Sequence, residues 1–172
     1  MTALRMEIDG AAATLAVLGD AVARTGDPRG LYDRIGASLV ASTQKRFEDE
    51  KDPEGNPWPA SLRKTLFGGR TLTMTARLVQ SLTHEPSASG VAVGTNVIYG
   101  AIHQFGGIIK AKEPISGKEG GLRFRGAGGG WVRKDQVEIP KRAYLGLDAD
   151  DETEIRTNVA GWLGAQDDGK DR

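Results

Sequence analysis

The stretch IYGAIHQFGG, residues 98–107, predicts a short helix that stops at a pair of glycines. It contains His103, one of two histidines in the chain, with Tyr99 and Phe105 close to it in sequence. Gly106 stands where the helix should end, because glycine readily adopts the backbone conformation that follows a helix C-terminus. The stretch poses a choice between a catalytic histidine at the rim of a pocket and a packed helix end.

The residues before this stretch predict a loop, a short helix and a strand. KDPEGNPWPAS, residues 51–61, combines three prolines with a glycine and an asparagine, which is typical of a turn-rich loop. Trp58 lies between two of those prolines, and we expect it to clip the loop onto the core rather than to contact a partner. Residues 75–82 predict a short helix. GVAVGT, residues 90–95, predicts a β-strand bounded by glycines.

Two amphipathic helices are predicted ahead of that loop. Residues 3–25 place apolar side chains near one helical face with alanines between them. Glu7 and Asp9 interrupt the apolar run that a signal peptide would need, so we expect a helix of the mature protein. Residues 29–50 repeat apolar side chains at spacings of three and four, and Asp27 before a proline is typical of a helix N-cap. We expect the two helices to form a hairpin.

The residues after the short helix predict a hairpin, an extended segment and a closing helix. Residues 107–139 are rich in glycine, and LRFR and GWVRKDQVEI alternate as strands do on either side of GAGGG. We therefore expect a hairpin with a loose tip. IPKRAYLGL, residues 139–147, is expected to be extended, and Asp148 can cap a final helix over residues 150–163.

Together these elements predict an α+β fold. It comprises an N-terminal helical hairpin, a small antiparallel β-sheet with a long basic hairpin, a short signature helix and a C-terminal helix. The 172 residues suit a single domain, expected over residues 1–165, with a flexible acidic tail over residues 166–172. The chain has no cysteine, which excludes disulfides and thiolate chemistry. No stretch has the apolar length of a membrane span, so we expect use on the cytoplasmic side.

Charge is balanced over the whole chain but uneven along it. The chain carries 23 basic and 23 acidic residues, so its overall charge does not point to DNA or membrane. Residues 102–145 carry nine basic and four acidic residues, a net of +5. Residues 146–172 carry three basic and eight acidic residues, a net of −5. Such segregation either serves contacts between subunits or leaves two solvated faces of opposite sign.

The sequence offers little for catalysis or metal binding. The acid nearest to His103 within ten residues is Glu113, on a different predicted element, and a metal site would need at least three ligands. The chain has no HExxH, no Gly-x-Ser-x-Gly and no Walker A loop. We expect His103 on the buried face of its helix, hydrogen-bonded through one nitrogen. We expect no enzyme, no cofactor and no metal, although an enzyme that uses His103 stays a minor alternative.

The predicted hairpin carries a second alternative function. LRFRGAGGGWVRK interleaves basic and aromatic side chains that could follow a phosphate backbone and stack on bases. The other interpretation is an exposed antiparallel hairpin with one face toward solvent and one toward protein. The interleaved residues are Arg123, Phe124, Arg125, Trp131, Arg133 and Lys134, and all of these except Phe124 are candidate interface or channel-facing residues.

Read together, several stretches resemble the phage virion morphogenesis family. They are STQKRFEDEKDPEGNPWPASLRKT, LTMTARLVQSL, VAVGTNVIYGAIHQFGG and IPKRAYLGL. The resemblance covers residues 31–163, with Tyr144 at a position where the family usually has phenylalanine. The positions that carry it are Arg46, Phe47, Pro53, Gly55, Pro57, Trp58, Leu78, Ser81, Leu82, Val93, Gly94, Thr95, Tyr99, Ile102, His103, Gln104, Phe105, Gly106, Pro140, Arg142, Tyr144, Leu145 and Gly146.

The resemblance implies a structural role in assembling a tailed bacteriophage. The family groups tail-completion proteins of the Mu and P2 type and is related to the neck proteins of siphophages. It implies a homo-oligomeric ring, commonly sixfold, that completes the tail end or neck around the DNA channel so that head and tail join. The implied partners are other copies of the chain, a connector or stopper, a tail terminator or tail tube, and genomic DNA in the channel, but no membrane. The implied location is the virion, after assembly in the host cytoplasm.

The resemblance also gives roles to single residues. It makes His103 part of a structural signature, with Tyr99 and Phe105 packing the short helix onto the sheet. It implies no cofactor. The signature and packing residues are Phe47, Trp58, Tyr99, His103, Gln104, Phe105, Gly106, Arg142 and Tyr144.

Overall fold

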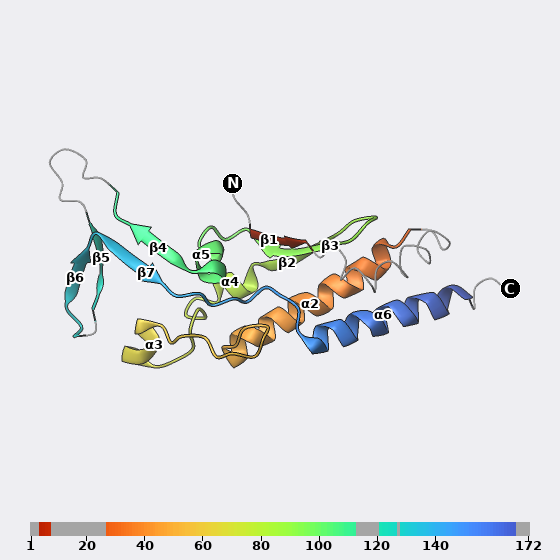
Figure 1. Cartoon of the computed structure of the whole chain (residues 1–172), viewed down its shortest axis with the longest axis horizontal. Helices are drawn as coiled ribbons and strands as arrows, with labels where there is room; N and C mark the ends of the chain where they lie inside the picture. Colours follow the sequence, from red (N-terminus) through yellow and green to blue (C-terminus); the bar gives the residue numbers. More distant parts are fainter. Residues whose placement is uncertain (1–3, 8–26, 113–120, 127, 168–172) are drawn as a thin grey trace.

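Two long helices, a three-stranded sheet and a projecting arm make up the described part of the chain (Figure 1). The computed structural model describes residues 4–7, 27–112, 121–126 and 128–167. The α+β class is confirmed. The elements are β1 (Leu4–Glu7), α2 (Arg29–Asp49), α3 (Leu62–Phe67), α4 (Arg77–Gln80), β2 (Leu82–Pro86), β3 (Val91–Thr95), α5 (Gly100–Phe105), β4 (Gly107–Lys110), β5 (Leu122–Arg125), β6 (Trp131–Lys134), β7 (Gln136–Ile139) and α6 (Ala149–Asp167).

The predicted long helix of residues 29–50 is confirmed as α2, which lies between the sheet and α6 (Figure 1). The N-cap is Pro28 rather than the predicted Asp27, although the Asp27 carboxylate accepts a hydrogen bond of 3.0 Å from the backbone N–H of Arg29 beside the first turn. The helix ends at Glu50, whose backbone is left-handed. Its inner face buries a row of apolar side chains against the sheet, namely Leu31, Ile35, Leu39 and Phe47.

The three-stranded sheet has the order β1-β3-β2, with both outer strands antiparallel to β3. The predicted strand over residues 90–95 is therefore the central strand. The prediction of a helix from residue 3 is wrong for residues 4–7, which form β1 and run along the edge of β3 from Leu4 opposite Thr95. Pairing satisfies backbone groups along that edge of β3, and this outweighs the helical composition of so short a segment. The rest of that predicted helix, residues 8–26, lies outside the described residues.

The loop of residues 51–61 is confirmed, and Trp58 clips it onto the core as expected. The indole N–H donates a 2.9 Å hydrogen bond to the carbonyl of Ala143. The ring of Phe47 meets the indole edge-on at 5.2 Å between centroids and lies 5.3 Å from the ring of Tyr144. These three buried rings join α2, the loop and the segment before α6 into one core.

The next elements differ in part from the prediction. The helix expected over residues 75–82 is shorter, because α4 ends at Gln80 and Leu82 opens strand β2 opposite Thr95. Helix α3 is an element that was not predicted, and the Ser61 hydroxyl caps it by accepting a hydrogen bond from the N–H of Lys64. The short signature helix is confirmed as α5.

The predicted basic hairpin is part of a larger arm that extends from the body (Figure 1). We call residues 107–112 together with residues 121–126 and 128–139 the arm. Strands β5 and β6 form the expected hairpin at the far end. Strand β4 pairs with β7 to form the stem, from Gly107 opposite Ile139 to Lys110 opposite Gln136. This second pairing was not predicted.

Helix α6 closes the fold and begins near where it was expected. The Asp148 carboxylate caps it by accepting a 2.9 Å hydrogen bond from the N–H of Asp151. The helix continues to Asp167, and residues 168–172 of the predicted tail lie outside the described residues. Within the described ranges, none of the helices combines the length and apolar character that a membrane span needs.

Candidate functional site

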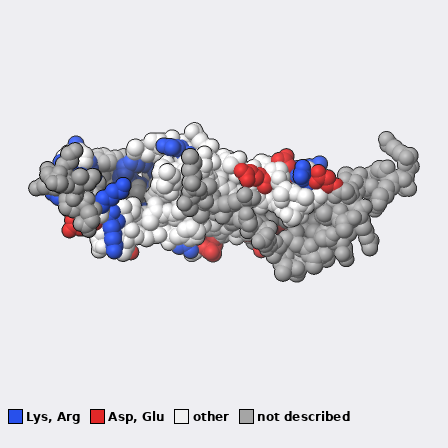
Figure 2. Space-filling model, turned by 90° about the horizontal axis from the view of Figure 1, so that it is seen from above, with Lys and Arg blue, Asp and Glu red and all other residues white. Residues whose placement is uncertain are grey.

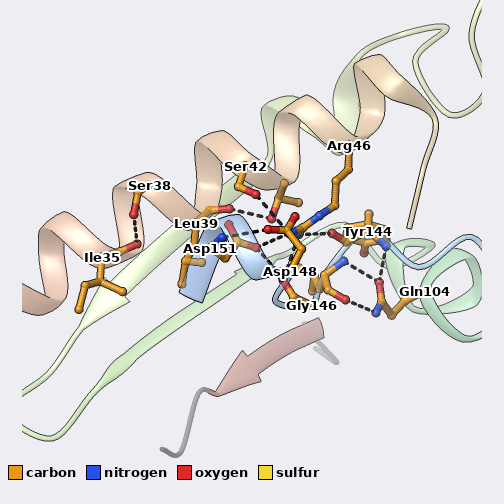
Figure 3. Close-up of polar contacts among 12 residues, drawn as sticks. Ile35, Ser38, Leu39, Ser42, Arg46, Gln104, Tyr144, Gly146, Asp148 and Asp151 are labelled. Carbon is orange, nitrogen blue, oxygen red and sulfur yellow. Dashed lines mark hydrogen bonds and ion pairs between the residues drawn. The ribbon is translucent and has the colours of Figure 1, made fainter. Parts of the chain in front are cut away.

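The segment between the arm and α6 is a strap, residues 140–147, which is buried over residues 142–145, and Gln104 of α5 holds it (Figure 3). The Gln104 side-chain oxygen accepts hydrogen bonds from the backbone N–H groups of Tyr144 at 2.9 Å and Leu145 at 3.0 Å. Its amide nitrogen donates to the carbonyl of Leu145 at 2.8 Å. One side chain thus does for the strap what a neighbouring strand does in a sheet, satisfying backbone groups that would otherwise be buried without partners.

Arg46 ties α2 to the other side of the strap and to α6 (Figure 3). Its side chain donates to the Gly146 carbonyl at 3.0 Å and to the Asp148 carboxylate at 2.8 Å, and it also bonds the Asp151 carboxylate. Arg46 is only 5% exposed, so its charge requires these acids as partners. The family resemblance included Arg46, but the two acids were not predicted as its partners.

The Asp148 carboxylate beside Arg46 is held in its charged state. Burial raises the pKa of Asp148, but hydrogen bonds from Arg46 and from the backbone of Asp151 outweigh burial, and the net pKa is lowered. A group with a lowered acid pKa stabilises the folded state above its unfolded pKa and loses that contribution as the pH falls. Arg46, Asp148 and Asp151 therefore form a structural cluster rather than a proton-transfer site.

Arg142 anchors the strap at its first half. Its guanidinium donates to the Pro59 carbonyl at 2.6 Å. This bond ties the strap to the loop of residues 51–61, which contains Trp58 and is called the tryptophan loop below. Its backbone N–H donates to the carbonyl of His103 at 2.7 Å, which ties it to the end of α5. Gly106 permits this contact, since a Cβ there would lie 2.8 Å from the backbone nitrogen of Lys141.

His103 is half-buried rather than on a fully buried helix face as expected. Its Nδ1 atom is buried and has no hydrogen-bond partner among the described residues, where a bonded ring nitrogen was predicted. Burial lowers the pKa of His103, because a charged imidazolium is less well solvated there. The nearby positive charge of Arg142 lowers this pKa further by repelling the imidazolium. The described residues contain no group of three or more potential metal-ligating His, Cys, Asp or Glu side chains.

The roles expected for Tyr99 and Phe105 are corrected. Both were expected to pack α5 onto the sheet, yet Phe105 is 66% exposed and Tyr99 is 40% exposed. The Tyr99 ring instead approaches the ring of His103 edge-on at 6.1 Å. The physical reason is that α5 is held through backbone and amide hydrogen bonds of Gln104 and His103, so these two rings are left at the surface.

Exposed apolar side chains continue from α5 along the arm. Large apolar residues on a monomer surface are informative when they gather in one region, because such regions mark interaction sites. The exposed apolar residues of this region are Ile98, Tyr99, Phe105, Ile108, Ile109 and Trp131. They cover the base, stem and tip of the arm.

The tip of the arm has two different faces. Because side chains alternate along a strand, the register places Arg123, Arg125, Trp131 and Arg133 on one face. The guanidinium carbons of Arg123 and Arg125 lie 5.6 and 5.1 Å from the centre of the Trp131 ring, within range of a cation–π contact. Lys134, grouped with them from the sequence, falls on the opposite face. Figure 2 shows Lys and Arg side chains gathered at this end of the molecule.

A groove lies on the body between the end of α2, the tryptophan loop and the start of α6. It has a volume of about 550 Å³. Acidic side chains dominate its wall, and Asp148 and Asp151 among them are already paired with Arg46. The acidic residues of the wall outside that cluster are Asp49, Asp52, Glu54, Asp150 and Glu154, beside Lys45 and Lys51. The sequence indicated an acidic C-terminal segment but not this groove.

Comparison of the sequence with known proteins finds relatives of this chain. The sequence model of the phage virion morphogenesis family matches residues 9–164. A protein of Escherichia phage Mu named "Putative capsid assembly protein G" is 30% identical over 130 residues, which is 70% of this chain and 70% of that protein. No solved structure matches the chain significantly.

Proposed function

The chain belongs to the phage virion morphogenesis family, and we propose that it completes the tail end or neck of a tailed phage as a homo-oligomeric ring around the DNA channel. In that position it joins head and tail as a structural component and carries out no chemistry of its own. The similar Mu protein is named for capsid assembly, which agrees with a role in building the particle.

The observation that carries this proposal is the exposed apolar and basic surface of the arm and its base. Phe105, Ile108 and Trp131 are more than half exposed, although each would be stabilised by burial. Strand β4 is exposed on both faces. A two-stranded ribbon of this kind is marginally stable alone, so a protein partner on the arm would supply the missing burial.

The opposite charges of two segments of the chain support a ring. The +5 net charge of residues 102–145 and the −5 net charge of residues 146–172 lie on separate segments. A contact between two different surfaces of identical subunits repeats from one subunit to the next, and a suitable rotation closes it into a ring. The signature residues around the strap would keep the subunit rigid enough for such a repeat.

The proposal is tested with particles from which this protein has been removed by deletion of its gene. Electron microscopy should show filled heads and tails that accumulate unjoined, and expression of the protein in trans should restore joined particles. Tails of irregular length would assign it to the tail end, whereas normal free tails would assign it to the neck. Normal joined, infectious particles without the protein would refute the proposed function.

A further inference from the structure

We propose that the tip of the arm of one subunit binds in the acidic groove of a second copy of the chain. This inference rests on the ring proposed above and names the surfaces that form its contact. The tip is the face that carries Arg123, Arg125, Trp131 and Arg133, and the groove is the one between the end of α2 and the start of α6.

The tip is built in a way that calls for an anionic partner. The register puts Arg123 and Arg125 on one face, and both guanidinium groups lie over the ring of Trp131, so two like charges are held close together. A partner that brings carboxylates to this face offsets their mutual repulsion.

The tip also has the composition of a binding hot spot. Trp131 is 63% exposed, and the guanidinium groups of Arg123 and Arg125 lie over its ring. Tryptophan and arginine are the residues that most often dominate binding energy at protein interfaces. The cation–π contacts hold the two arginines in place before binding, which lowers the entropy lost when the contact forms.

The groove has the complementary charge. Arg46 neutralises its two innermost acids, but five further carboxylates on the wall face only two lysines. Those five are Asp49, Asp52, Glu54, Asp150 and Glu154. The guanidinium groups of Arg123 and Arg125 entering this groove would offset most of its excess negative charge.

The two surfaces meet only between copies of the chain. Figure 1 shows the β5–β6 tip at one end of the molecule, well away from the start of α6. The stem of the arm and the strap lie between the tip and the groove. The contact therefore joins two different surfaces of neighbouring copies, and a suitable rotation closes such a repeated contact into a ring.

Nucleic acid is the competing occupant of the tip. A base that stacks on Trp131 needs the face of the indole ring, but two guanidinium groups already lie over that ring. The groove, with five carboxylates beside two lysines, also offers the tip a site of complementary charge on a second copy of the chain. Both observations favour a second copy of the chain over DNA.

The test is a charge swap between the two surfaces, made in the full chain. The tip variant carries Arg123→Glu and Arg125→Glu. The groove variant carries Asp49→Lys and Glu154→Lys, which leaves the cluster around Arg46 intact. Each variant should raise the Kd for self-association at least about tenfold, because like charges then face each other. Light scattering after size-exclusion chromatography measures the mass, and circular dichroism checks the fold.

An equal mixture of the two variants gives the decisive result. Every tip then finds a groove of opposite charge, because the Glu tip fits the Lys groove and the unchanged Arg tip fits the unchanged acidic groove. The mixture should therefore assemble as wild type does, and high salt should weaken both assemblies. Matched reversals elsewhere on the surface, Arg34→Glu and Glu48→Lys, should leave association unchanged; both residues are exposed on α2.

Three results would overturn the inference in different ways. If wild type assembles and the variants either assemble alone or fail to reassociate when mixed, the tip does not bind the groove although the ring stands. If the tip variant assembles normally but loses binding to a fluorescent DNA duplex, the tip serves DNA instead. If wild type stays a monomer at every concentration, the ring itself fails, and the inference fails with it.

Discussion

Replacing Gln104 with methionine should destabilise the protein more than any comparable change at its surface. The glutamine side chain makes three hydrogen bonds to the backbone of Tyr144 and Leu145, both of which are buried. Methionine keeps the length and shape of the side chain but cannot donate or accept in this way. Each buried polar group left without a partner costs about 1–3 kcal/mol. Because Gln104 is only half-buried, water can satisfy some of the freed groups. We therefore expect the free energy of unfolding to fall by about 3 kcal/mol in total.

The loss is measured by equilibrium unfolding in urea. Trp58 and Trp162 are buried, so their fluorescence reports the loss of the core. A loss of about 3 kcal/mol corresponds to a fall in Tm of roughly 6–12 °C for a chain of this size. The control is Gln44→Met, the same substitution at an exposed position of α2, which should change stability by less than about 0.5 kcal/mol. If the two variants unfold at the same urea concentration, Gln104 does not hold the strap and the account of the site is wrong.

Three further predictions concern the groups around the strap. Trp58→Phe should cost about 2 kcal/mol, because the carbonyl of Ala143 loses its donor and the smaller ring leaves a gap. Gly106→Ala should cost about 1–3 kcal/mol or more, since Gly106 has φ 71° and ψ 179°, a region open almost only to glycine. The unfolding free energy should fall as the pH drops below about 6.5, because the unfolded state binds a proton at His103 before the folded state does; His103→Asn should lose that part of the slope.

Each of these has a result that would count against it. A Trp58→Phe variant as stable as wild type would mean that the indole N–H bond adds nothing. Gly106→Ala should be compared with Gly30→Ala, where a new Cβ meets no atom within 4 Å, and equal stability of the two would contradict the backbone argument. If His103→Asn keeps the full pH dependence above pH 5, the lowered pKa belongs to another group.

Local patterns in the sequence predicted the elements that depend on local forces. Helix α2 follows from apolar side chains spaced three and four apart, and α5 from a short segment that stops at Gly106. Alternation predicted the hairpin of LRFR and GWVRK, whereas the register that puts Arg123, Arg125, Trp131 and Arg133 on one face and Lys134 on the other comes from the structure. The tryptophan loop was predictable because prolines leave few other conformations.

The contacts that define the site could not be predicted, since they join residues far apart in the chain. Gln104 bonds residues 40 and 41 positions away, and Arg46 bonds acids 102 and 105 positions away. The stem strand β4 escaped prediction because its four residues are exposed on both faces and so show no alternation. The helix predicted for residues 4–7 was wrong because their conformation also depends on a distant segment. Their composition suits a helix, but pairing with β3 makes them a strand.

The central claim, a ring at the tail end or neck of a virion, is tested most directly by quantitative mass spectrometry of purified particles. The measurement gives the number of copies of this protein relative to the portal and the major tail protein. The account predicts a small, fixed number that equals one ring and does not change with tail length. A number that scales with the major tail protein, or absence of the protein from finished particles, would contradict it.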